Sequence, residues 1–307
     1  MLIGGIAKRR DEMKTNTNVD VYQIVTDRII AKLEAGVVPW RKEWHGTIDG
    51  AFNRITRKPY SLLNQMLLSK DGEYASIKQW NKLGGRVKKG EKGEIVVFWK
   101  MNQYHKSHIE INEDGEEEQV IEVKNIPTLK YYYVFHISQI EGVKPLDIQK
   151  PTNVDPIGKA EEVIANYVKK DGLKFQNNVP SNRAYYAPAI DKVVVPMLSQ
   201  FDKANEYYAT VFHELTHSTK HPKRLDRSNT GVSAFGSEDY SKEELVAEIG
   251  SCNLMNIIGI ETEGTFNNSA SYIDSWLHAL KNDRKLIVSA SSQAQKATDY
   301  ILKFSEE

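Results

Sequence analysis

The pentapeptide His-Glu-Leu-Thr-His at residues 213–217 constrains this chain more than any other feature of its sequence. On a helix, His213 and His217 lie one turn apart and about 40° apart around the axis, so both imidazoles can bind one metal ion. Glu214 lies beside them, where it can take a proton from water at the metal. With 8 histidines in 307 residues, about 0.02 such patterns are expected by chance. We therefore predict a helix over residues 204–220 with His213 and His217 as metal ligands and Glu214 as the catalytic base.

A catalytic zinc site needs a third protein ligand and an open position for water. One further turn of the same helix offers His221, but this residue lies at the predicted helix end. The next predicted helix, over residues 242–258, offers Glu244 and Glu248 on one face. We favour Glu244 as the third ligand and Glu248 as a residue that orients a ligand histidine. Glu244 is also explained by a capping box that begins at Ser241.

The motif and the later carboxylates resemble the zincin metallopeptidases whose third ligand is a glutamate on the following helix. The resemblance implies metal-assisted hydrolysis of a peptide bond with one zinc ion, Zn2+, and Mn2+ or another divalent ion is the alternative. It also implies an edge strand that aligns the substrate, for which residues 192–196 are the candidate and an internal core strand is the alternative. Three residues are candidates for stabilising the oxyanion: Arg227, Tyr240 and His221.

The first half of the chain contains a basic stretch that is rich in aromatic residues. Residues 41–100 hold 13 basic and 6 acidic side chains, although the whole chain has 41 of each. Single-stranded nucleic acid is bound by rings that stack on bases and cations that follow the phosphates. An aromatic core beneath a solvated lysine surface is the alternative explanation. The residues predicted to bind DNA are Trp40, Arg54, Lys58, Tyr60, Trp80, Lys89, Lys92 and Trp99.

Four phrases of the sequence resemble the N-terminal domain of ArdC-type antirestriction proteins, which is shared with some plasmid primases. These phrases lie at residues 36–44, 53–64, 77–93 and 134–142. Because that family fuses this domain to a zincin-like domain, the resemblance covers residues 19–305. It implies a module that binds single-stranded DNA and a role in protecting incoming mobile DNA, such as a plasmid, from host restriction.

Periodicity and turn residues predict an α+β protein. A mixed α/β domain that binds single-stranded DNA, with strands at residues 94–100 and 130–140, precedes a mainly helical zincin-like metallopeptidase domain with a small sheet. The predicted parts are a flexible tail at 1–18, the DNA-binding domain at 19–142, a linker at 143–158 and the metallopeptidase domain at 159–307.

The cysteine count and the length of apolar runs indicate the cellular compartment and limit the possible partners. The single cysteine, Cys252, excludes a disulfide framework within the chain and is typical of a reducing compartment. No apolar run approaches the ~18 residues of a membrane span, so we expect a cytoplasmic protein without a membrane partner. The expected partners are single-stranded DNA and a peptide or protein substrate, such as a restriction enzyme subunit. Two alternatives stay open: a non-catalytic DNA-masking protein with a structural metal domain, and a protease of the DNA–protein crosslink repair type.

Overall fold

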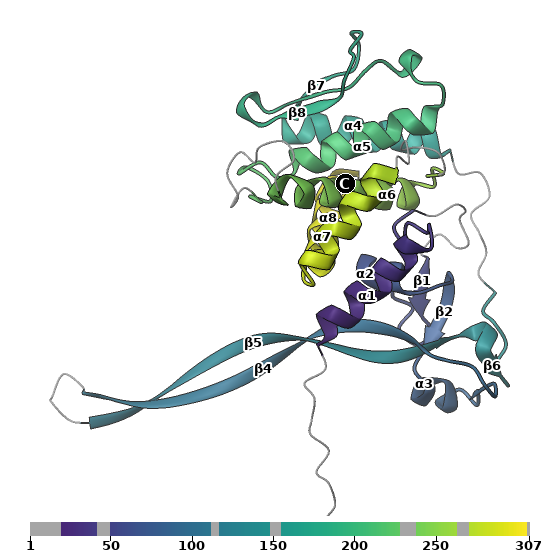
Figure 1. Ribbon diagram of the computed structural model, residues 1–307, viewed down its shortest axis with the longest axis vertical. Coiled ribbons are helices and arrows are strands. Elements are labelled where there is room, and N and C mark those ends of the chain that lie inside the picture. Colours follow the sequence, from purple (N-terminus) through teal and green to yellow (C-terminus); the bar gives the residue numbers. More distant parts are fainter. Residues whose placement is uncertain are drawn as a thin grey trace, which may run out of the picture.

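The computed structural model describes residues 20–41, 50–111, 117–147, 155–227, 238–262 and 270–305. Both halves of the chain contain helices and strands, which confirms the predicted α+β class (Figure 1). The α-helices are α1 (Val21–Glu34), α2 (Leu62–Leu67), α3 (Ile77–Lys82), α4 (Pro156–Asp171), α5 (Ala204–Ser218), α6 (Glu238–Ile258), α7 (Ala270–Asn282) and α8 (Leu286–Leu302). The β-strands are β1 (Ala51–Asn53), β2 (Gly72–Ala75), β3 (Arg86–Val87), β4 (Glu94–Ile111), β5 (Glu117–His136), β6 (Ile140–Glu141), β7 (Lys174–Gln176), β8 (Tyr185–Ala187) and β9 (Lys192–Val194).

A four-stranded sheet with the order β1-β2-β5-β4 organises the first half. Strand β2 runs parallel to β1 and antiparallel to β5, and β5 is antiparallel to β4. Helix α1 begins where the carboxylate of Asp20 accepts hydrogen bonds from the backbone N–H groups of Tyr22 and Gln23. Its fully buried Val25 and Ile29 then pack in one apolar cluster with residues of β4. These contacts hold α1 against the part of the sheet that contains β4.

The β4–β5 hairpin is much longer than the sequence predicts. Strands are expected at residues 94–100 and 130–140, whereas β4 and β5 stay paired as far as Ile111 and Glu117. Figure 1 shows the distant part of this hairpin extending away from the helices. The acidic stretch 110–122 conceals the extension in the sequence, because Asp and Glu are depleted in strands.

The second half contains helices α4 to α8 and a three-stranded sheet with the order β7-β9-β8. Strand β9 is parallel to β7 and antiparallel to β8. Of the two interpretations of residues 192–196, the edge strand is wrong and the internal strand is confirmed for β9, because hydrogen bonds to neighbouring strands occupy both of its sides. The edges of this sheet are β7 and β8.

The two halves share one hydrophobic cluster. Helices α1 and α2 pack on α7 and α8, and their buried side chains join those of α6 in the same cluster. The indole of Trp40 lies edge-on against that of Trp276, with 5.2 Å between the ring centroids. Next to it, Arg41 forms a salt bridge with Glu248 of α6 at 2.7 Å. The domain boundaries stay a prediction, but any such division crosses this common core.

Candidate metal centre

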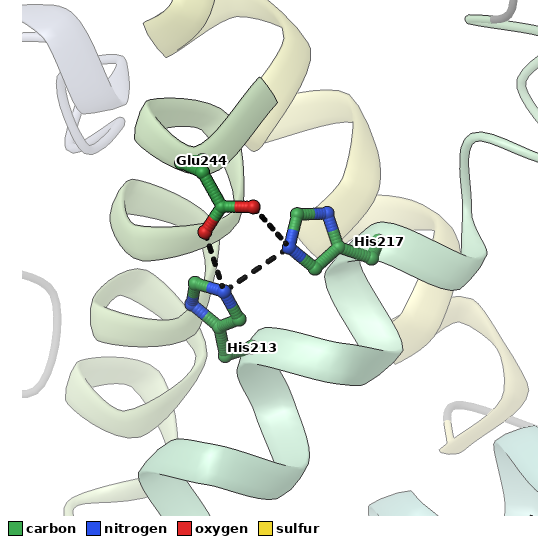
Figure 2. A group of neighbouring side chains, drawn as sticks. All are labelled: His213, His217 and Glu244. Carbon is green, nitrogen blue, oxygen red and sulfur yellow. Dashed lines mark hydrogen bonds and ion pairs between the residues drawn. The ribbon is translucent and has the colours of Figure 1, made fainter. Parts of the chain in front are cut away.

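Helix α5 carries both predicted ligand histidines, and its orientation is fixed by a buried apolar side. Tyr208, Phe212 and Leu215 are buried in a second cluster with α4 and the last turns of α6. Because these residues face the core, His213 and His217 emerge together at the flank of the helix that faces the start of α6 (Figure 2). Burial of one helix face therefore aims both imidazoles at the same point.

Helix α6 crosses α5 at short range. A Cβ atom on Gly250 would lie 2.7 Å from Cγ2 of Thr216, so a glycine is needed where the helices approach most closely. One residue later, the hydroxyl of Ser251 donates to the carbonyl of Ala209 at 2.8 Å. This crossing sets the position of the first turns of α6 relative to the histidines.

Glu244 of α6 meets both histidines, as Figure 2 shows. Its two carboxylate oxygens lie 3.4 Å from Nε2 of His213 and 3.4 Å from Nε2 of His217. The two Nε2 atoms are 3.1 Å apart. Among the described residues, these three form the group whose ligand atoms all lie within 4.8 Å of one another.

The spacing and chemistry of this group fit a divalent metal ion. Ligand atoms about 2.0–2.1 Å from a tetrahedral zinc ion lie about 3.3–3.4 Å from one another. The two Nε2 atoms, 3.1 Å apart, are close to that spacing, and Glu244 offers one oxygen to each imidazole at 3.4 Å. With one ligand atom taken from each residue, the three atoms lie within 4.8 Å of one another. Two imidazoles and one carboxylate leave a fourth position for water, which is typical of catalytic rather than structural zinc sites.

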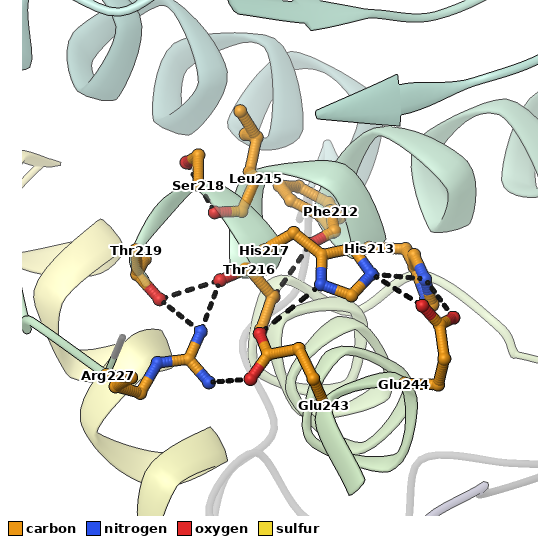
Figure 3. A network of polar contacts seen from close by, with 10 residues as sticks. All are labelled: Phe212, His213, Leu215, Thr216, His217, Ser218, Thr219, Arg227, Glu243 and Glu244. Atoms are coloured by element: carbon orange, nitrogen blue, oxygen red, sulfur yellow. Dashed lines mark hydrogen bonds and ion pairs between the residues drawn. The ribbon is translucent and has the colours of Figure 1, made fainter. Parts of the chain in front are cut away.

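A second network of polar contacts engages His217 through its other ring nitrogen, Nδ1 (Figure 3). Oε1 of Glu243 accepts a hydrogen bond from Nδ1 of His217 at 3.3 Å, which leaves Nε2 to face the centre. The other carboxylate oxygen accepts from Nη1 of Arg227 at 3.0 Å. Arg227 also donates to the carbonyl of Thr216 at 2.8 Å and to the hydroxyl of Thr219 at 3.0 Å. The guanidinium thus ties Glu243 to the end of α5.

The electrostatics of the centre favour a bound cation. Burial lowers the pKa of His217, but hydrogen bonds to Glu243 and Glu244 outweigh it and raise this pKa to about 10. Burial raises the pKa of the Glu244 carboxyl, but its contacts with His213 and His217 hold it well below its usual range. The pKa of Glu243 is lowered in the same way, because the hydrogen bond to His217 and the charge of Arg227 outweigh the effect of burial. The carboxylates therefore stabilise a positive charge here.

Glu214, the predicted catalytic base, is buried on α5 directly after the first histidine. Its charge contributes to the raised pKa of His217, so it acts within electrostatic range of the centre. A buried carboxylate that is not part of the ligand group is suited to exchange protons with water bound there.

The structure places the other predicted residues of this site differently. Glu248 lies one turn beyond Glu244, but it pairs with Arg41 instead of a histidine, which contradicts its predicted orienting role. Arg227, a candidate for the oxyanion, is engaged with Glu243. His221 is outside the ligand group, and its Nδ1 accepts from the backbone N–H of Lys223. The side chain of Tyr240 is outside the described residues.

Sequence reasoning missed Glu243. Both Glu243 and Glu248 follow the pattern of a second carboxylate near the predicted ligand Glu244. Which of them faces His217 depends on how α6 is rotated against α5, and the local sequence of α6 does not determine this rotation. The available signal was Gly250, since a glycine inside a helix indicates close approach of another element.

The residues predicted to bind DNA divide into buried and accessible groups. Trp40 is 2% exposed and Trp80 is 0% exposed, with the indole N–H of Trp80 donating to the carbonyl of Phe135. The prediction that these two rings stack on bases is wrong for this structure, because both belong to the core. Arg54 forms an ion pair with buried Glu73. Tyr60 is half-buried, and exposed side chains are found at Lys58, Lys89, Lys92 and Trp99.

Comparisons with known proteins cover both halves of the chain. A family model described as the N-terminal domain of anti-restriction factor ArdC matches residues 19–135, and one described as a zincin-like metallopeptidase matches residues 161–293. None of the described helices has both the length and the apolar character needed to cross a bilayer.

Individual relatives show the same two-part similarity. The solved structures of the antirestriction protein ArdC from plasmid R388 align with TM-scores of 0.70 (metal-free, 35% identity) and 0.71 (Mn(II)-bound, 34% identity). The metal-free alignment covers 94% of this chain and 98% of that one. Protein y4eC of Sinorhizobium fredii is 31% identical, with 93% of this chain and 92% of that protein covered. A DNA primase TraC of Escherichia coli is 33% identical over 93% of this chain, which spans only 27% of that primase.

Proposed function

Because the chain belongs to the ArdC-type family of antirestriction proteins, we propose that it binds single-stranded DNA and hydrolyses peptide bonds at a metal centre formed by His213, His217 and Glu244. We place this activity in the cytoplasm, where incoming mobile DNA meets host restriction enzymes. The substrate class is a protein associated with that DNA, such as a restriction enzyme subunit. One observation carries the enzymatic part: three ligand atoms converge beside a buried glutamate that the ligand group does not use.

Each residue of the site has its own chemical role in the proposed hydrolysis. A bound divalent ion would supply Lewis acidity to a water molecule and to the carbonyl of the scissile peptide bond. Glu214 accepts the proton of the attacking water and later delivers it to the leaving amine. Glu243 keeps the Nδ1 proton on His217, so Nε2 presents its lone pair to the ion. Zinc is the ion we propose, since two imidazoles and one carboxylate suit it, and manganese is the alternative.

The alternative of a purely DNA-masking protein makes no use of Glu214. A structural zinc site has four protein ligands and needs no base, whereas this group has three ligands and a buried carboxylate next to them. The geometry therefore favours a hydrolase.

The variant Glu214→Gln tests the proposal. We expect it to keep one equivalent of bound metal, measured by elemental analysis, and to bind a single-stranded oligonucleotide like the wild type. Cleavage of labelled casein, with the oligonucleotide present, should fall roughly 10²–10⁴-fold. Wild-type protein that binds metal but cleaves neither casein nor a restriction enzyme would contradict the hydrolase proposal. If the variant still protects plasmid DNA fully in a restricting host, the DNA-masking alternative is the better account.

A further inference from the structure

The extended β4–β5 hairpin has two faces of different chemistry. Side chains alternate between the faces of a strand pair, and the pairing register places Phe98 opposite Lys130 and Tyr104 opposite Lys124. At the base of the hairpin, Val96 packs on one side of the sheet. The neighbouring Val97 packs in the cluster on the other side. Beyond this base, the side chains of residues 98–109 and 119–128 are exposed or half exposed.

One face is basic and the other carries no formal charge. Over residues 98–108 and 120–130, the face continuous with Val96, which we call the lysine face, holds four lysines and one glutamate, Glu122. The register pairs Glu110 with Glu118 one step further out, where this basic stretch ends. The opposite face, over residues 99–109 and 119–129, holds no Lys, Arg, Asp or Glu. The aromatic rings and the lysines of the lysine face are Phe98, Lys100, Tyr104, Lys106, Lys124 and Lys130.

Rings and cations alternate along the lysine face. Each of the two aromatic residues lies directly across from a lysine, and a further lysine follows two residues beyond each ring on β4. Phe98 and Tyr104 are 43% and 55% exposed, so both rings are accessible. From residue 98 to residue 108 the hairpin is about 34 Å long at ~3.4 Å per residue. That length matches about ten nucleotides stacked at ~3.4 Å each.

The aromatic row continues onto the body of the protein. The ring of Tyr132, itself partly exposed, lies 5.7 Å from that of Phe98 in an edge-to-face arrangement. Tyr132 lies within electrostatic range of Tyr60, which packs against the core residue Tyr74. The hairpin therefore presents a path of rings that begins at the sheet and runs outward along one face.

We propose that the lysine face of the β4–β5 hairpin is a binding surface for single-stranded DNA, with the phosphates along Lys100, Lys106, Lys124 and Lys130 and bases stacked on Phe98 and Tyr104. This inference deepens the proposed function and rests on its DNA-binding part. An acidic protein would be attracted by the lysines but would make no use of the exposed rings. A single strand engages both, since its bases are unpaired and its phosphates are regularly spaced.

Trp40 and Trp80 are buried, so the accessible rings available for stacking on bases are Phe98 and Tyr104. Trp99 is not part of the proposed DNA surface, because this residue lies on the uncharged face and packs edge-on against Tyr22 of α1 at 6.4 Å. Trp99 is as exposed as the two rings of the lysine face, so it is a matched control for them.

The test uses the full-length protein and a fluorescent single-stranded 20-mer. In the quadruple variant K100Q/K106Q/K124Q/K130Q, the plot of log affinity against log salt should become shallower by about 3, at ~0.7 per lost phosphate contact. At 100 mM salt the affinity should fall roughly 10²-fold. The control K159Q/K169Q/K174Q/K296Q removes four exposed lysines from the second half of the chain and should leave both quantities unchanged. Thermal unfolding checks that all variants stay folded.

A second pair of variants leaves every charge in place. F98L/Y104L should weaken binding at least tenfold, since each stacked base contributes about 1–3 kcal/mol, while W99L should bind like the wild type. Wild-type protein that does not bind the 20-mer would refute the proposed DNA binding itself. A wild type that binds and a quadruple variant with unchanged affinity and salt slope would overturn only the hairpin proposal. Tighter binding of the wild type to the matching duplex would overturn the choice of a single strand.

Discussion

The contact between Glu243 and His217 gives the sharpest test of the metal centre. The carboxylate performs two tasks, since it fixes the proton on Nδ1 of His217 at 3.3 Å and neutralises buried Arg227 at 3.0 Å. Replacing it by glutamine preserves the shape but removes the charge. Loss of such an outer contact reduces metal affinity about 10–100-fold, which is about 1.4–2.8 kcal/mol of binding free energy.

The same substitution should also destabilise the metal-free protein. The side chain of Arg227 is only 6% exposed, so a weaker partner leaves its charge poorly compensated. We expect the free energy of unfolding to fall by about 1–3 kcal/mol. The double variant E243Q/R227M removes the uncompensated charge and should recover much of this stability while the metal affinity stays low. This separation would distinguish an effect on His217 from general loss of folding.

Competition with a zinc-sensitive dye measures the affinity, and urea unfolding measures the stability. Glu248→Gln is the matched control, because it makes the same chemical change one turn beyond Glu244 but acts on the salt bridge to Arg41. It should lower stability and leave metal affinity unchanged. Wild-type metal affinity in E243Q, or a loss in E248Q as large as in E243Q, would refute the reasoning.

Four further outcomes follow from the structure. Gly250→Ala should lower the free energy of unfolding by about 1–3 kcal/mol in urea titrations, because its Cβ would lie 2.7 Å from Cγ2 of Thr216, and T216S should restore part of the loss. Metal binding at pH 7.5 should release about one proton, seen by calorimetry in buffers of different ionisation enthalpy, because the pKa of His217 is raised to about 10. Without metal, the raised pKa stabilises the fold fully below the ordinary value of 6.5, and this contribution disappears as the pH rises through 10, so a pH-independent stability across this window would contradict it. Trp40→Ala should cost about 3–5 kcal/mol and lower the unfolding transitions of both halves together, since the ring packs on Trp276; separate transitions with only one of them shifted would contradict a common core.

The elements that the sequence predicts well are those governed by local patterns. The buried face of α5 repeats every three to four residues, so its existence and its bounds near Ala204 and Ser218 could be read from periodicity. The one-turn spacing of His213 and His217 is likewise a property of any helix. The position of Glu244 beside them required only that the next helix pack on α5.

The features that sequence reasoning missed depend on tertiary contacts. The sequence of β9 is compatible with an edge strand and with an interior strand, because the order of strands in a sheet depends on the other strands as well. Aromatic residues are common both in cores and on DNA-binding surfaces, so composition does not separate the two. For this reason the sequence wrongly predicts that Trp80 contacts DNA and does not identify the exposed Phe98. The outer part of the β4–β5 hairpin has no buried face, so no alternation of buried and exposed residues marks its pairing in the sequence.

The common core of the two halves limits how this gene could be rearranged. A fragment starting near residue 155 would keep every residue of the metal centre but would bare the apolar sides of α7 and α8 that α1 and α2 now cover. It would also leave the carboxylate of Glu248 without its partner Arg41. Exchange of either half for a foreign module would require a substitute for both contacts, so the halves are expected to be inherited together.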